Sequence, residues 1–187
     1  MPHIKLNNQL PGITGLLEYR LDTALPIREL TEILLRQENS LTRGERELIA
    51  SLVSSKNECF YCTNAHVTVT NQLLGEEETT HCVIHNDIDS AKISDKMKAL
   101  LKIALQVQKS GKEVTKVAIK NAKDCGANDN EIHDTVLIAS LFCLYNKYVD
   151  GMATIAPKEQ EYYNQLGHKI VDFGYNRRPQ NLPKIKH

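Results

Sequence analysis

Two cysteines separated by two residues are the part of this sequence best suited to chemistry. Cys59 and Cys62 lie in the run NECFYCTNAH, at the start of a helix predicted from about residue 59 to residue 74. Side chains three apart on a helix have Cβ atoms about 5 to 6 Å apart, which allows a disulfide after a small adjustment. The unpaired amides of a helix N-terminus also stabilise a thiolate, the reactive form of cysteine. The spacing is therefore typical of a redox site or of a metal site.

A base and a carboxylate are expected near this pair. His66 follows Cys62 by four residues, one turn further along the same helix face, where its imidazole reaches the sulfur directly or through one water. Glu47 is expected on the preceding helix, and in an antiparallel hairpin it can face the second helix and orient the imidazole. The loop before Cys59 decides which face Glu47 presents. Two interpretations of Glu47 thus stay open: a member of a proton relay, or a solvated surface carboxylate.

The remaining cysteines, Cys82, Cys125 and Cys143, have no partner nearby in the sequence, and we expect them to be structural. An odd number of cysteines spread over a long chain argues against a disulfide framework and indicates reduced thiols. One alternative is a structural zinc site that combines the cysteine pair with His81 and His85, because two such ligand pairs suit tetrahedral zinc. The gap between the two pairs holds a whole predicted helix and is longer than in the usual zinc finger, which disfavours this alternative.

Composition is that of one ordinary soluble domain. The chain has 187 residues, 41% hydrophobic and 25% charged, and its 23 basic residues balance 23 acidic ones. This excludes collagen-like, disordered and disulfide-scaffold proteins. Without a concentrated basic surface, neither nucleic acid nor an anionic membrane is an expected partner. The first ten residues lack a secretory apolar region, and the longest apolar run is about half a membrane span, so we expect a cytoplasmic location.

Helical periodicity and capping signals run along the whole chain, and no strand-length alternation is found. We predict an all-α fold, a single-domain helical bundle, with residues 1–25 as an N-terminal segment, 26–166 as the helical domain and 167–187 as a basic tail. Pro26 is expected at the first position of the first helix. The predicted helices cover about residues 26–36, 43–54, 59–74, 94–110, 114–126, 128–144 (as the central buried helix) and 157–166.

The tail from residue 168 to residue 187 has two interpretations. The first is that this basic segment is a solvated loose end of the chain. It also carries Ile170, Val171, Phe173 and Tyr175, which would be apolar residues with nothing to cover. The competing interpretation is therefore an arm laid on a neighbouring subunit.

The site residues resemble the carboxymuconolactone decarboxylase-like superfamily, specifically its alkylhydroperoxidase D-like, peroxidase-related branch. Glu47, Cys59, Cys62 and His66 match the spacing E-x11-C-x2-C-x3-H throughout. The run SSKNECFYC resembles the Ser, Asn, Cys, Tyr, Cys succession of that branch. The resemblance covers roughly residues 26 to 165.

A later predicted helix adds to the resemblance. Phe142, Asn146 and Asp150 are similar to the F-x3-N-x3-D pattern of the branch, and Lys147 stands where an arginine is common. That departure concerns the second helical layer and leaves the redox centre intact.

The resemblance implies an all-helical subunit that assembles into a homo-trimer or homo-hexamer and acts as a thiol peroxidase without a cofactor or a metal. By this likeness Cys62 attacks the peroxide, and Cys59 resolves the sulfenic acid to a disulfide. His66 and Glu47 relay the proton. The substrate is then an organic hydroperoxide or hydrogen peroxide, and the reductant is a dithiol or lipoyl-type donor.

Two points stay open after this comparison. The helix terminus favours Cys59 as the more acidic thiol, whereas His66 is nearer to Cys62 in the sequence; we follow the resemblance and assign the attack to Cys62. A thiol-disulfide oxidoreductase or redox sensor that uses the same pair without turning over peroxide is the second alternative function.

Overall fold

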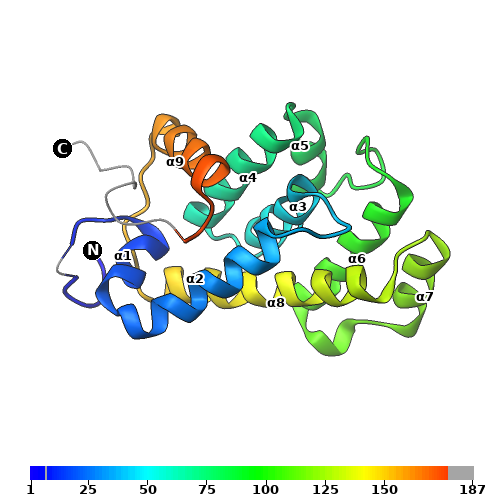
Figure 1. The fold of residues 1–187 in the computed structure, drawn as a ribbon, viewed down its shortest axis with the longest axis horizontal. Coiled ribbons are helices and arrows are strands. Elements are labelled where there is room, and N and C mark those ends of the chain that lie inside the picture. The colour runs from blue at the N-terminus through cyan, green and yellow to red at the C-terminus, as the bar shows by residue number, and fades with distance from the viewer. Residues whose placement is uncertain (7, 177–187) are drawn as a thin grey trace.

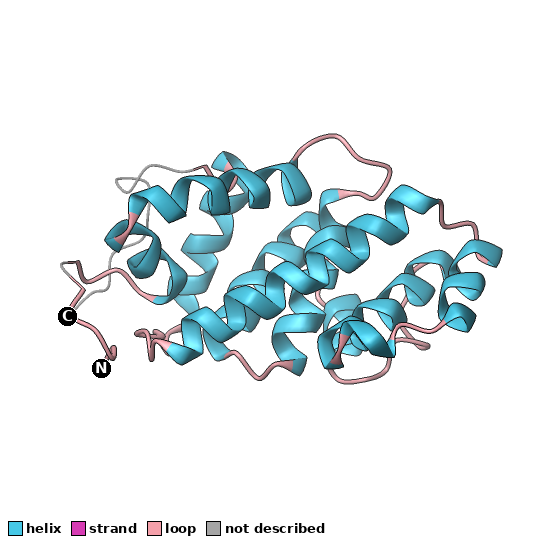
Figure 2. Cartoon of the chain, turned by 90° about the horizontal axis from the view of Figure 1, so that it is seen from below, coloured by secondary structure: helices cyan, strands magenta, loops and turns pink. Residues whose placement is uncertain are grey.

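The computed structural model describes residues 1–6 and 8–176, and it is all helical over that part of the chain (Figures 1 and 2). The elements are α1 (Gly12–Tyr19), α2 (Leu21–Arg36), α3 (Arg43–Lys56), α4 (Phe60–Leu74), α5 (Glu78–Ile84), α6 (Asp95–Lys109), the 3-10 turn η1 (Gly111–Glu113), α7 (Lys116–Asp124), α8 (Asp129–Gly151) and α9 (Gln160–Phe173). The all-α prediction is confirmed. Within the described residues, no helix has both the length and the apolar character needed to span a membrane.

Three of the predicted helix starts are confirmed by their caps. The Thr42 hydroxyl accepts from the Glu45 amide at 3.2 Å, and the Glu45 carboxylate accepts from the Thr42 amide at 2.8 Å. Asn128 and Glu131 form the same reciprocal box at the start of α8. Ser94 caps α6 through the amide of the third helical residue. Each cap satisfies amides that the first helical turn leaves unpaired, so these starts are fixed locally.

The start of α2 differs from the prediction. The helix begins at Leu21, and Pro26 lies inside it rather than at its first position. Pro26 cannot donate to the carbonyl of Asp22. It is itself exposed, however, and Ala24 in the preceding turn is completely buried, so packing holds that turn in place.

The most buried helix is α3, and the prediction that 128–144 would be the central buried helix was wrong. Every residue of α3 from 46 to 54 is buried, and the helix packs against α4, α5, α6 and α8. The longer α8 runs along the molecule with α6 and α7 toward one end and α1 and α9 toward the other (Figure 1). It keeps one side in solvent, where Leu144 is 51% exposed.

The last helix is longer than predicted. It begins at Gln160 and ends at Phe173, past the predicted end at residue 166. Ile170 explains the extension, because it is buried in a second apolar cluster formed mainly by α4 and α9. The chain therefore covers part of the apolar surface of its own tail, although Phe173 stays exposed. The basic residues from Arg177 onward lie outside the described residues. Helices α1 and α5 were not predicted.

A short turn joins α3 to α4 and is held from two sides. Glu58 has φ of 58°, a left-handed conformation that is rare for a residue with a side chain. The amides of Asn57, Glu58 and Cys59 all donate to carbonyls in the last turn of α3. The Asn57 side chain donates to Asn146 of α8 at 2.8 Å and accepts from Gln108 of α6 at 2.8 Å. These bonds fix the direction in which α4 leaves α3.

This network predicts that Asn146→Ala destabilises the protein by roughly 2 kcal/mol. The buried Asn146 amide also donates to Ser54 at 3.1 Å, and its loss leaves buried polar groups unpaired, at a cost of about 1 to 3 kcal/mol each. Urea denaturation followed by circular dichroism measures the change. Ser140→Ala, at an exposed site on the same helix, is the control, with a change within about 0.5 kcal/mol. Equal stability of the two variants would contradict the argument.

Candidate active site

The two cysteines of the C-x-x-C pair are in contact at the start of α4. Cys59 is the N-cap residue and Cys62 lies in the first turn. The Cys59 thiol donates to Cys62 Sγ at 2.9 Å, and both cysteines are free and buried. This hydrogen bond, together with burial, raises the pKa of Cys59 well above that of an ordinary thiol. The expectation that the helix terminus lowers the pKa of Cys59 was therefore wrong, because the hydrogen bond to Cys62 and burial act in the opposite direction and prevail.

The α3–α4 hairpin also brings Glu47 and His66 together. His66 Nδ1 lies 2.7 Å from Glu47 Oε2, and the Glu47 side chain has no exposed surface, whereas that of His66 is 12% exposed. Phe142 and the imidazole pack in a T-shaped arrangement, with ring centroids 4.5 Å apart. Glu47 is thus not a solvated surface carboxylate. Because the carboxylate only accepts, Nδ1 carries the proton, and Nε2 is the nitrogen left for a second partner.

Tyr175 is a third member of this contact, and no pattern in the sequence predicted it there. Its hydroxyl donates to Glu47 Oε1 at 2.6 Å, and its ring lies nearly parallel to His66, with 16° between the planes. Both oxygens of the buried carboxylate are therefore hydrogen-bonded. Tyr175 is 128 positions from Glu47 in the chain. Its only signal in the sequence was that of an apolar tail residue in need of cover.

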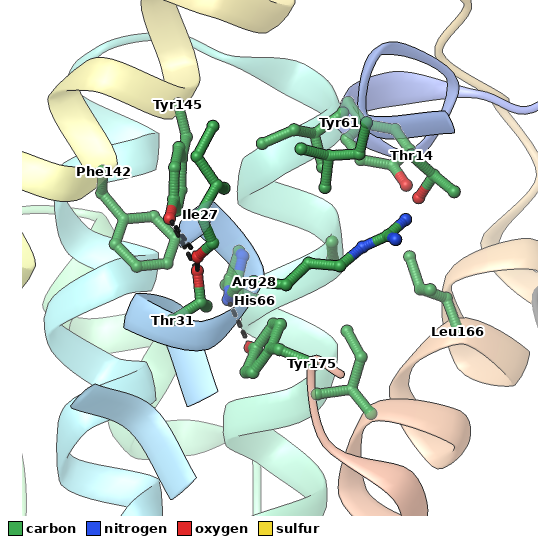
Figure 3. Close-up of a pocket in the computed structure, with 14 residues that line it drawn as sticks. Thr14, Ile27, Arg28, Thr31, Tyr61, His66, Phe142, Tyr145, Leu166 and Tyr175 are labelled. Carbon is green, nitrogen blue, oxygen red and sulfur yellow. Dashed lines mark hydrogen bonds between the residues drawn. The ribbon is translucent and has the colours of Figure 1, made fainter. Parts of the chain in front are cut away.

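A small cavity of about 70 Å³ opens beside His66 (Figure 3). Its walls are largely apolar, and two of its polar groups, Thr31 and Tyr145, hydrogen-bond each other at 2.6 Å. Neither cysteine is among the lining residues, which are Ile13, Thr14, Leu17, Ile27, Arg28, Thr31, Tyr61, Ala65, His66, Phe142, Tyr145, Leu166, Ile170 and Tyr175. Cys62 lies one turn before His66 on α4, in the same apolar cluster as the lining residues Tyr61, Ala65, Leu166 and Ile170.

Close packing between α1 and α4 shapes one wall of this cavity. Tyr61, between the two cysteines, lies against Gly12, where a Cβ atom would be 2.1 Å from the tyrosine ring. Gly12 also has φ of 56°, in the left-handed region. Glycine is thus required here on both grounds, and it lets α1 close over the start of α4.

The residues of the later motif have different surroundings. Phe142 contacts the imidazole, and Asn146 belongs to the buried network at the α3–α4 turn. Asp150 and Lys147 are exposed on α8. The lysine that replaces the common arginine therefore lies on the surface, away from the pocket.

The zinc alternative finds no support in the arrangement of its ligands. His81 and His85 stack on each other on α5, with ring centroids 4.2 Å apart. Throughout residues 1–6 and 8–176, no three His, Cys, Asp or Glu side chains are placed to hold one metal ion. The cysteine pair and the histidine pair are thus separate features.

The raised pKa of Cys59 predicts an order of thiol labelling. Cys59 stays protonated as the pH rises through the ordinary range of thiols, so we expect iodoacetamide to alkylate Cys62 before Cys59 at neutral pH. Peptide mapping over a time course measures both sites. Cys62→Ala is the matched variant, since it removes the acceptor of the Cys59 hydrogen bond and makes Cys59 easier to label. Faster labelling of Cys59 than of Cys62 in the unmodified protein would contradict the prediction.

Comparison with known proteins gives structural neighbours. No protein-family model and no curated protein matches the sequence. The structure is similar to a crystal structure described as an alkylhydroperoxidase AhpD core, an uncharacterized peroxidase-related protein from Ralstonia eutropha JMP134. The TM-score is 0.74 and the identity 25%, over 84% of this chain and 81% of that one. An uncharacterized peroxidase-related protein from Silicibacter sp. TM1040 also has a TM-score of 0.74, with 24% identity over 83% of this chain and 80% of the other. The chain thus has the fold of the alkylhydroperoxidase D-like, peroxidase-related proteins that its motif resembles.

Proposed function

We propose that this protein is a thiol peroxidase that needs no cofactor and reduces organic hydroperoxides or hydrogen peroxide at the expense of a dithiol. The observation that carries the proposal is the 2.7 Å contact between buried Glu47 and His66, one helical turn after a pair of reduced cysteines in contact. The likeness to peroxidase-related proteins supports it. Cys62, Cys59, His66 and Glu47 are the proposed catalytic residues.

In the first step, the Cys62 thiolate attacks the terminal oxygen of R–O–O–H. The S–O bond forms as the O–O bond breaks, so the sulfur is oxidised by two electrons to a sulfenic acid and the peroxide is reduced to R–OH. His66 first accepts the Cys62 proton and then returns it to the leaving alkoxide, while Glu47 holds the imidazole. The hydrogen bond from Cys59 to Cys62 Sγ stabilises the attacking thiolate.

In the second step, Cys59 attacks the sulfenic sulfur. A disulfide forms and water leaves with the proton of the Cys59 thiol. The distance of 2.9 Å between the sulfurs favours this closure. A dithiol donor, for example a lipoyl-type group, then reduces the Cys59–Cys62 disulfide by thiol-disulfide exchange. The donor is itself oxidised to a disulfide, and both protein thiols are restored.

Peroxide consumption by cysteine variants tests the assignment of roles. With a dithiol donor we expect wild-type turnover and none with Cys62→Ser, which cannot form the sulfenic acid. Cys59→Ser is the matched variant, and it should consume about one equivalent of peroxide and then stall without a resolving thiol. If Cys62→Ser kept the one-equivalent burst and Cys59→Ser lost it, the two roles would be exchanged. Wild-type protein that exchanges dithiols yet is inert toward every peroxide would favour the oxidoreductase or sensor instead.

The relay predicts a second set of rates. His66→Ala should slow the peroxide step by about 100- to 10,000-fold, the usual contribution of a positioned proton-transfer group. Glu47→Gln keeps the size of the side chain and should slow the same step through loss of the charged partner. Stopped-flow measurement with reduced protein isolates the step, and circular dichroism verifies folding. Unchanged rates in both folded variants would exclude the relay.

We further propose a homo-trimer or homo-hexamer. Helix α2 exposes four large apolar side chains, Leu21, Leu25, Leu30 and Ile33, by 36 to 63%, and such a surface is suited to a subunit contact. Light scattering should give about three or six times the 21.1 kDa chain mass, and Leu25→Glu should lower that mass. A monomer at micromolar concentration would refute this assembly.

A further inference from the structure

The segment after α9 is fixed in place by a contact with α2 that is separate from the candidate active site. Gly174 turns the chain with φ of 67°, and a Cβ atom there would meet the Glu32 carboxylate at 2.5 Å. The backbone amide of Tyr175 donates to Glu32 Oε2 at 2.6 Å. This anchor determines where the Tyr175 side chain begins, and it requires glycine before it.

From this anchor, the Tyr175 hydroxyl reaches the two relay residues. It lies 2.6 Å from Glu47 Oε1 and 3.4 Å from His66 Nδ1. The shorter contact takes the hydroxyl proton, since a carboxylate is a pure acceptor. Glu47 then accepts from Tyr175 on Oε1 and from His66 on Oε2. Each carboxylate oxygen thus has its own donor, and the two hydrogen bonds together fix the orientation of the Glu47 carboxylate.

We propose that Tyr175 is a positioning residue for the Glu47–His66 relay, and that Glu32 acts through it; this inference rests on the proposed function. The hydroxyl keeps Oε1 occupied so that Oε2 faces His66, and this fixes the proton on Nδ1 and leaves Nε2 as the base. The Tyr175 ring lies nearly parallel to the imidazole, with the ring centroids 6.2 Å apart. A buried carboxylate that loses one of its two donors is less well held in one orientation.

The test compares Tyr175→Phe with wild type and with Tyr19→Phe. Phenylalanine keeps the ring beside His66 and removes only the hydroxyl. Tyr19→Phe removes a hydroxyl from a half-exposed ring outside the cavity. We expect Tyr175→Phe to slow the reaction of reduced protein with peroxide by about tenfold. The pH profile of the reaction should also differ from that of wild type, because the hydroxyl that holds the relay carboxylate is missing. Tyr19→Phe should change neither.

Glu32 variants test the anchor. Glu32→Ala should reproduce the effect of Tyr175→Phe, whereas Glu32→Gln keeps an oxygen for the Tyr175 amide and should restore most of the rate. Thermal unfolding verifies that every variant folds. A merely structural role for Tyr175 would alter stability and leave the pH profile in place.

A readout without peroxide separates this inference from the proposed function. The rate at which iodoacetamide labels Cys62 is measured against pH in each variant. A shifted labelling profile in Tyr175→Phe supports the positioning role even if the wild type reduces no peroxide, a result that would overturn the proposed function alone. If Tyr175→Phe matches wild type in both its labelling profile and its peroxide rate, the positioning role is refuted and the peroxidase proposal stands.

Discussion

A carboxylate without any exposed surface has to find its hydrogen-bond donors inside the protein. Glu47 is such a group, and leaving it unpaired in the core would cost several kcal/mol. Its two donors come from different parts of the chain, His66 from α4 and Tyr175 from the segment after α9. Both donors can reach Glu47 because α3 is a buried helix enclosed by other elements of the fold.

The position of the cysteine pair depends on a second set of hydrogen bonds, those of the turn between α3 and α4. Asn57 in that turn is bound to α6 and to α8, so the start of α4 has a fixed direction relative to three helices. The two thiols that follow are inequivalent. Cys59 is a hydrogen-bond donor with a raised pKa, and Cys62 is its acceptor. The protein therefore distinguishes two chemically identical side chains by the direction of one hydrogen bond rather than by the dipole of the helix.

Features that depend on contacts between residues close in the sequence were predictable, and features that depend on contacts between distant residues were not. The capping box at Thr42 and the positions of Cys62 and His66 on one helix depend on neighbours within four residues, so they were predictable. The start of α2 before Pro26 depends on the burial of Ala24 in the core. The approach of Tyr175 to Glu47 depends on a turn held by a distant helix. No local pattern encodes such contacts. The raised pKa of Cys59 was missed for a related reason, since the spacing of two cysteines contains no information about how deeply the pair is buried.

The size of the cavity connects the substrate to the relay. At about 70 Å³ it is less than half as large as a cavity of roughly 150 Å³ that admits benzene. Hydrogen peroxide or the head group of a hydroperoxide fits such a space, whereas a bulky organic hydroperoxide fits only if a wall moves. Every lining residue except Tyr175 belongs to a helix. Tyr175 is held instead by the hydrogen bonds of its amide to Glu32 and of its hydroxyl to Glu47. A substrate that displaced it would also remove a donor from Glu47. On the proposed function, the same side chain thus sets both the room for the substrate and the alignment of the base that acts on it.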